Sequence, residues 1–167
     1  MNLISRYLSK RRESELIDYV EQEAKIAERF VIECIDELIR QSNTLLSILL
    51  SGAGGALALS VSFARNGLTG DLSYAIFVVS AYLCLLSAVI VVRCLWSNDI
   101  YPPAHEPKYL FQTEFTANQI RASDLKTRQE AIDKNTERLL SMAAWLNYAR
   151  IGAVLTPVLF VVSLFIF

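Results

Sequence analysis

Hydrophobic and polar positions are separated into long blocks along this chain. Residues 44–64, 74–96 and 151–167 are nearly free of charged side chains, while the rest of the chain is charged and amphipathic. A helix needs about 20 apolar residues to cross a hydrocarbon core of roughly 30 Å. Apolar blocks of this length are rare in a soluble domain of this size. The pattern therefore predicts an all-α integral membrane protein with three transmembrane helices.

The polar segments complete the predicted organisation, because each one separates or flanks the apolar blocks. No Pro or Gly interrupts the chain from Thr116 to Arg150, so we expect the last polar segment to continue as a helix into the third span. The four predicted segments are a cytoplasmic amphipathic region (1–43), a transmembrane hairpin (44–96, with spans 44–64 and 74–96), a cytoplasmic Pro-rich turn with helices that complete a bundle (97–141), and the third transmembrane helix (142–167).

The distribution of Lys and Arg predicts the orientation in the membrane. Seven of these residues precede the first span, one lies in the loop after it, and six lie between the second and third spans. Because Lys and Arg favour the cytoplasmic side, the N-terminus and the long second loop are expected inside and the C-terminus outside.

Arginines accompanied by aromatic residues mark the expected cytoplasmic ends of two spans. Arg93 with Trp96, and Arg150 with Trp145, combine a long cationic side chain with a ring that favours the membrane interface. We interpret these four residues as interface anchors. A cationic ring near a pore mouth is the alternative.

The first polar segment has a heptad pattern of apolar residues, which follows Ser14, the residue expected to cap this helix. A second apolar stripe widens the face, and a later helix adds Ile132 and the polar Asn135, which is suited to fixing register. The pattern indicates either an oligomer or partner interface or packing within the chain. The seam consists of Ile17, Val20, Ala24, Ala27, Val31, Cys34 and Leu38, and the second stripe of Leu16, Ile26, Phe30, Ile35 and Ile39.

The first span is rich in small residues, and two sets repeat every four positions. One set is Ser47, Ser51 and Gly55, and the other is Gly52, Ala56 and Ser60. Small residues at this spacing favour close helix–helix contact, which is the first interpretation. The alternative is a hydroxyl-bearing stripe that lines a narrow pore between several copies. The pore-lining candidates are Thr44, Ser47, Ser51, Gly55, Ala58 and Ser62.

The third span contains Pro157 near its middle. A proline inside a helix lacks the N–H that would bond to the residue four positions earlier, here Ala153. We therefore predict a kink at Pro157.

Composition and motifs argue against several classes of function. The net charge is -1, which gives no sign of direct nucleic-acid binding. No nucleophile–base pairing and no metal-ligand spacing stand out, so no catalytic residue, metal site or cofactor is expected. No carboxylate or lysine lies deep in a span, which argues against a pump and leaves a passive pore open.

The order of parts resembles the small SLATT-type membrane modules of bacterial conflict systems. An amphipathic helix leads into two closely spaced spans, followed by the exit sequence Tyr101-Pro-Pro-Ala-His-Glu-Pro107 and long cytoplasmic helices; the likeness covers residues 13 to about 140. The resemblance implies a homo-oligomeric effector in a bacterial inner membrane, active in antiphage defence. It also implies a cytoplasmic partner or nucleotide signal, such as a nucleotide-signal synthase, that controls opening.

Two functions follow from these patterns. The first is an oligomeric membrane channel or pore-forming effector. The second is a membrane anchor or scaffold that does not conduct and recruits a cytoplasmic partner through its helices. The channel function predicts that copies of the chain meet along the first span. The anchor function predicts that the apolar faces of the cytoplasmic helices matter more than the first span.

Overall fold

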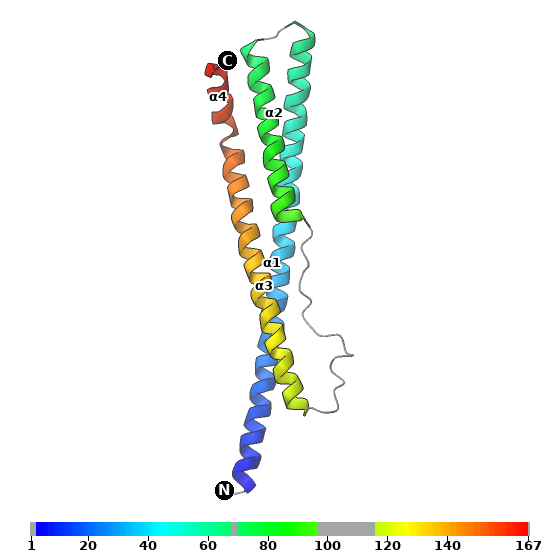
Figure 1. The fold of residues 1–167 in the computed structure, drawn as a ribbon, viewed down its shortest axis with the longest axis vertical. Coiled ribbons are helices and arrows are strands. Elements are labelled where there is room, and N and C mark those ends of the chain that lie inside the picture. Colours follow the sequence, from blue (N-terminus) through cyan, green and yellow to red (C-terminus); the bar gives the residue numbers. More distant parts are fainter. Residues whose placement is uncertain (1–2, 68–69, 97–115, 167) are drawn as a thin grey trace. The chain divides into compact units, whose positions relative to one another are not determined.

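A computed structural model describes residues 3–67, 70–96 and 116–166, with side chains described from residue 15 onward. The described chain is helical apart from short turns, which confirms the predicted all-helical fold class (Figure 1). The Pro-rich exit expected after the second apolar block lies outside the described residues. The helices are α1 (Leu3–Arg65), α2 (Asp71–Ile90), the π-helix η1 (Val91–Leu95), α3 (Ala117–Val154) and α4 (Thr156–Ile166).

Helix α1 runs without interruption for 63 residues. The expectation that Ser14 caps a new helix is wrong, because Ser14 lies inside α1. No proline occurs between Leu3 and Arg65, and a serine within a helix does not by itself end the helical hydrogen-bonding pattern. The helix ends where Gly67 adopts a φ of 71°, the left-handed conformation that commonly terminates helices.

Helix α3 begins with two hydrogen bonds from Thr116 to the side chain of Gln119. The Oε1 atom of Gln119 accepts hydrogen bonds from the Thr116 backbone N–H at 3.0 Å and from the Thr116 hydroxyl at 2.9 Å. Gln three positions after a threonine cap satisfies a backbone donor that the first helical turn would leave unpaired. The start of the helical pattern at Thr116, predicted from the sequence, is confirmed.

The chain divides into two compact units, which are described separately. Unit one comprises Met1–Ile35 and Asp99–Leu139, and unit two comprises Asp36–Asn98 and Leu140–Phe167. Within unit two, α2 runs beside the C-terminal part of α1, and α4 lies against α2 (Figure 1). The core of unit two is made of Leu49, Ala53, Leu83, Ile90, Cys94, Met142, Leu146 and Ala149.

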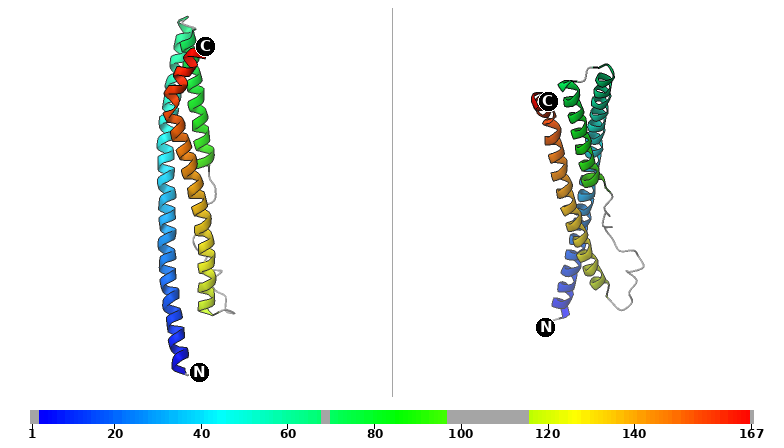
Figure 2. Two further views of the ribbon diagram at one scale, coloured as in Figure 1. Left: turned by 90° about the vertical axis from the view of Figure 1, so that its left-hand side faces the viewer. Right: turned by 45° about the horizontal axis from the view of Figure 1, so that its top comes forward.

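Two of the helices are long and apolar enough to cross a membrane. The first lies within α1, and the second spans Asp71–Leu95, which covers α2 and η1. Helices α3 and α4 pass the same test together, although they are bent by 48° at their junction (Figure 2). The described residues therefore contain two candidate membrane-spanning helices, or three if the bent pair forms one span.

The bend between α3 and α4 confirms the predicted kink. The regular helix is interrupted at Leu155, two residues before Pro157. Pro157 has no N–H to donate to Ala153, and its ring disfavours helical geometry in the residue that precedes it. The Leu155 N–H contacts the carbonyl oxygens of both Ile151, at 3.1 Å, and Gly152, at 3.2 Å, as the helix tightens before the break.

Candidate functional site

The six pore-lining candidates predicted from the sequence share one exposed face of α1. We call this face the outward stripe; it consists of Thr44, Ser47, Ser51, Gly55, Ala58 and Ser62, all exposed. Large apolar side chains flank it on both sides. Leu50 and Leu57 are 50% and 45% exposed on one side, and Ile48 and Leu59 are 63% and 54% exposed on the other. The stripe is therefore a shallow strip of small residues between apolar ridges.

Hydroxyl groups of the outward stripe have few partners within the chain. Thr44 donates to the carbonyl oxygen of Arg40 at 3.0 Å, one helical turn earlier. Among the described residues, the hydroxyl groups of Ser47, Ser51 and Ser62 have no hydrogen-bond partner. A Cβ atom added at Gly55 would meet nothing within 4 Å. The chain itself thus leaves this face of α1 open.

Two members of the second set of small residues, Ser60 and Gly52, contact α2. Ser60 donates to the Ser73 carbonyl oxygen at 3.1 Å, and Ser73 donates to the Ser60 carbonyl oxygen at 3.3 Å. Ser80 donates to the Ala53 carbonyl oxygen at 2.8 Å. At Gly52 an added Cβ atom would lie 3.3 Å from Leu83 Cδ1. Close packing therefore involves this set, and the two small-residue sets face different surroundings.

A tyrosine from α2 supports the end of α3 near the bend. The Tyr82 hydroxyl donates to the Gly152 carbonyl oxygen at 2.9 Å. A Cβ atom added at Gly152 would lie 2.9 Å from Leu86 Cδ2 and 3.0 Å from the Tyr82 hydroxyl oxygen. Any larger residue at this position would force the Leu86 and Tyr82 side chains of α2 to shift, so glycine allows these side chains to lie close to the α3 backbone. The hydrogen bond also serves a carbonyl group next to the break caused by Pro157.

The four predicted anchor residues lie at two places in unit two. Arg93 stacks over Trp145, with its guanidinium carbon 4.7 Å from the ring centroid, a cation–π contact. Arg150 donates to Gln41 Oε1 at 2.6 Å and to Asn147 Oδ1 at 3.3 Å. Trp96 is exposed, just after η1. Arg93, expected beside Trp96, thus contacts Trp145 instead, and neither this contact nor the Arg150–Gln41 hydrogen bond was identifiable from sequence spacing.

The heptad seam is divided between buried and exposed positions. In unit one, Val31 is buried, Ile17 and Ala24 are partly buried, and Val20 and Ala27 are exposed. Further along the chain, Cys34 and Leu38 are partly buried, and the α3 candidates Ile132 and Asn135 are buried. The second stripe includes large exposed residues on the first part of α1, namely Leu16, Ile26 and Phe30.

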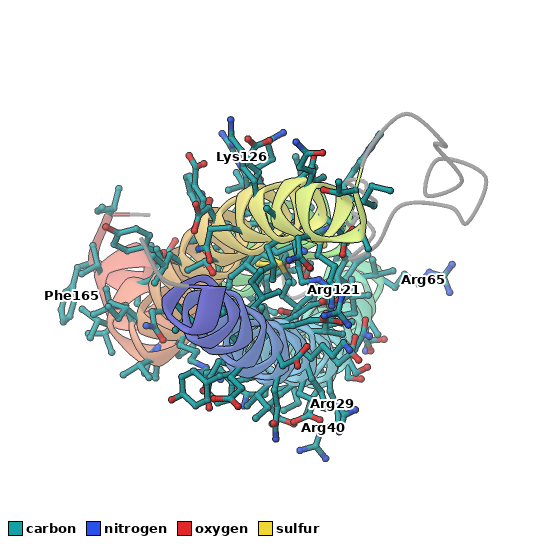
Figure 3. The ribbon with its side chains drawn as sticks, turned by 90° about the horizontal axis from the view of Figure 1, so that it is seen from below. Arg29, Arg40, Arg65, Arg121, Lys126 and Phe165 are labelled. Atoms are coloured by element: carbon teal, nitrogen blue, oxygen red, sulfur yellow. The ribbon has the colours of Figure 1, made fainter. Side chains whose placement is uncertain are left out.

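Ionic contacts join α1 and α3 within unit one, and these pairs were not identified from the sequence. Arg121 contacts Asp18 at 2.8 Å, and Arg128 contacts Glu28 at 3.3 Å and Asp124 at 3.4 Å. Figure 3 shows Arg121 directed toward α1 and Lys126 directed away from it. Arg128 and Glu28 are 100 residues apart, so helical spacing gives no signal for their contact.

A groove in unit two combines two arginines with polar and apolar side chains. It has a volume of about 390 Å³ and is lined by Arg40, Gln41, Thr44, Leu45, Ile48 and Arg150. Figure 3 shows Arg40 projecting outward from α1. No group of three or more His, Cys, Asp or Glu side chains suited to a metal ion occurs among the described residues.

Comparisons with known proteins add no assignment to this geometry. No protein-family model matches the chain, and no curated protein or solved structure matches it either.

Proposed function

We propose that the chain is a three-span protein of a bacterial inner membrane that assembles into a homo-oligomeric channel or pore. The α3–α4 pair forms the third span, the N-terminus is cytoplasmic and the C-terminus is external. The observation that carries this proposal is the exposure of the outward stripe along the whole apolar part of α1. Copies of the chain would meet there.

The physical argument concerns where hydroxyl groups can lie in a membrane. A polar group that faces hydrocarbon without a partner carries a cost, which a second helix or a water-filled path removes. Ser60, Ser73 and Ser80 already bond within the chain, whereas Ser47, Ser51 and Ser62 do not. Small residues between apolar ridges let another helix approach closely. Several copies around one axis would place the outward stripe along a narrow polar path.

In this proposal, a contact on the cytoplasmic side of the membrane controls the opening of the channel. Leu16, Ile26 and Phe30 are 62%, 56% and 64% exposed on the polar first part of α1. Exposed apolar side chains of this size in water favour a contact with another protein or another copy. A partner such as a nucleotide-signal synthase, in antiphage defence, would act on this surface. This part of the proposal rests on the resemblance to SLATT-type modules.

Single-channel recording in planar bilayers tests the channel. The wild-type protein should give discrete current steps, and Gly55→Leu should abolish them, because a leucine there fills the strip shared by neighbouring copies. An added Cβ atom at this position meets nothing within the chain, so folding and insertion should persist. Leu57→Phe is the matched control, because it adds bulk on an exposed flank outside the outward stripe. Equal currents from all three proteins would refute the proposed lining.

The second candidate function is a membrane anchor that does not conduct and recruits a cytoplasmic partner. The exposed row of Leu16, Ile26 and Phe30 favours it, because that surface is available whether or not the spans conduct. In this case, Ile26→Asp with Phe30→Asp would abolish partner capture while membrane insertion persists, and no variant would give current. Currents that the wild-type protein gives and the Gly55→Leu variant lacks would reject this alternative.

A further inference from the structure

We propose that the groove of Arg40, Gln41, Thr44, Leu45, Ile48 and Arg150 binds an anionic phospholipid. The phosphate group would lie between the two arginines and the first part of an acyl chain along Leu45 and Ile48. This inference uses the membrane location proposed above and is independent of whether the protein conducts.

The position of the two arginines supports a headgroup site. Arg40 lies one helical turn before Thr44, where the apolar part of α1 begins, and Arg150 directly precedes the apolar residues 151–167. The Arg150–Gln41 hydrogen bond of 2.6 Å places the starts of these two apolar segments side by side. Both cations therefore lie at one boundary between polar and apolar surface, the depth at which lipid phosphates are found.

The hydrogen bonds of Arg150 hold its guanidinium group without neutralising it. Its two partners, Gln41 and Asn147, are neutral amides that accept through their oxygen atoms. No carboxylate lies within ion-pair distance of Arg150 among the described residues. A guanidinium group has five N–H donors in a planar fork that matches a phosphate group. Arg150 is thus a fixed positive charge with donors to spare.

Arg40 is oriented by a carboxylate but retains free donors. Its Nε and Nη2 atoms donate to Glu37 at 2.9 and 3.0 Å, and the two N–H groups of Nη1 remain available. Gln41 also donates to Glu37, at 2.7 Å, so the same side chain connects Glu37 with Arg150. Hydrogen bonds from Gln41 and Arg40 lower the pKa of the Glu37 carboxyl group, which stays ionised. Two cations and one anion leave the cluster positive.

The apolar lining distinguishes a lipid from a free phosphate ion. Leu45 and Ile48 lie one turn and two turns beyond Arg40, and Ile48 is 63% exposed. A free phosphate ion would gain nothing from these side chains. A phospholipid gains from both ends of the groove, because its acyl chain continues from the phosphate along the apolar surface. Basic grooves at this depth beside membrane helices are common sites for anionic headgroups.

Native mass spectrometry of the full-length protein released from lipid nanodiscs tests the site. The nanodiscs contain phosphatidylcholine and phosphatidylglycerol in equal amounts, and retained lipid is counted by class. Wild-type protein should retain phosphatidylglycerol preferentially. With a loss of about five-fold for each arginine at an anionic surface, Arg40→Gln with Arg150→Gln should lower this preference about twenty-five-fold. Arg65→Gln should leave it unchanged, because Arg65 is a lone exposed arginine at the other end of the apolar part of α1.

Further arms separate the possible outcomes. The double variant Arg40→Lys with Arg150→Lys keeps both positive charges and should retain part of the preference for phosphatidylglycerol. Because it alters the same two positions, it also shows whether a loss in the glutamine variant comes from charge or from a folding defect. Equal retention of the two lipids by wild-type protein, or full preference in the glutamine variant, would overturn the site. Displacement of the lipid by glycerol 3-phosphate alone would assign the groove to a soluble phosphate and overturn the lipid proposal. Failure to enter nanodiscs would instead contradict the membrane location.

Discussion

Two helical glycines, Gly152 and Gly55, should respond differently to the same substitution by alanine. In both cases alanine raises helix propensity by about 1 kcal/mol, so this contribution cancels in the comparison. At Gly152 the new Cβ atom would lie 2.9 Å from Leu86 Cδ2 and 3.0 Å from the Tyr82 hydroxyl oxygen, whereas at Gly55 it would meet nothing within 4 Å. Overpacking of this kind costs about 1–3 kcal/mol. Gly152→Ala should therefore be less stable than Gly55→Ala by about this amount.

The assay is thermal unfolding in one detergent, followed by circular dichroism of the helical signal. A difference of 1 kcal/mol corresponds to about 2–4 °C in midpoint for a chain of this size. Tyr82→Phe adds a check, because it removes the hydroxyl that both crowds the new Cβ atom and donates to the Gly152 carbonyl at 2.9 Å. The two substitutions should be clearly non-additive. Equal midpoints for the two alanine variants would refute the close approach of α2 to α3 at Gly152.

Two further predictions concern unit one. The Arg128 and Glu28 side chains are 10% and 12% exposed, so Arg128→Met should destabilise the unit by about 3 kcal/mol, while adding Glu28→Leu should restore most of this loss. Hydrogen exchange of the α3 amides measures both, and a double variant no better than the single one would contradict the ion-pair account. The hydrogen bond from Lys25 lowers the pKa of Glu21 below its ordinary 4.5. The ion pair therefore contributes its full stability above pH 4.5, and this contribution is lost as the pH falls through the lower pKa of Glu21 in the folded state. Glu21→Gln should accordingly flatten the acid side of a plot of unfolding midpoint against pH. An unchanged slope would show that the Glu21–Lys25 pair contributes nothing to stability.

Much of the fold follows from hydrophobic spacing, because long apolar blocks and proline positions act locally. The helical class, the start of α3 after Thr116 and the kink near Pro157 were all predicted on this basis. The continuity of α1 through Ser14 was not, because a capping residue signals a helix start only where the preceding residues leave the helix. Whether the residues before Ser14 are helical depends on the surrounding chain and not on the serine itself.

The candidate site was harder to predict because its surroundings are set by distant residues. Ser51 and Gly52 are adjacent, exposed and both part of small-residue repeats, yet an added Cβ atom at Gly52 would lie 3.3 Å from Leu83, whereas the Ser51 hydroxyl group has no partner among the described residues. Spacing identifies such repeats but does not say which one the rest of the chain covers. The groove could not be predicted for the same reason, because it depends on a contact between Gln41 and Arg150, which are 109 residues apart in the sequence. The local contacts of Glu37 with Arg40 and Gln41 fit helical spacing, and only packing adds Arg150.

The division of the serines between two faces determines which variants can reveal function. Ser60 and Ser80 are buried and bond to backbone carbonyl groups, so substitutions there would change packing whether the protein conducts, binds lipid or recruits a partner. A side chain added at Gly55 on the outward stripe, by contrast, would meet no other atom of the chain within 4 Å of its Cβ atom. A functional loss at Gly55 without a fall in unfolding midpoint therefore reports a contact between molecules. The same reasoning applies to Arg40, whose exposed side chain hydrogen-bonds to Glu37 of its own helix.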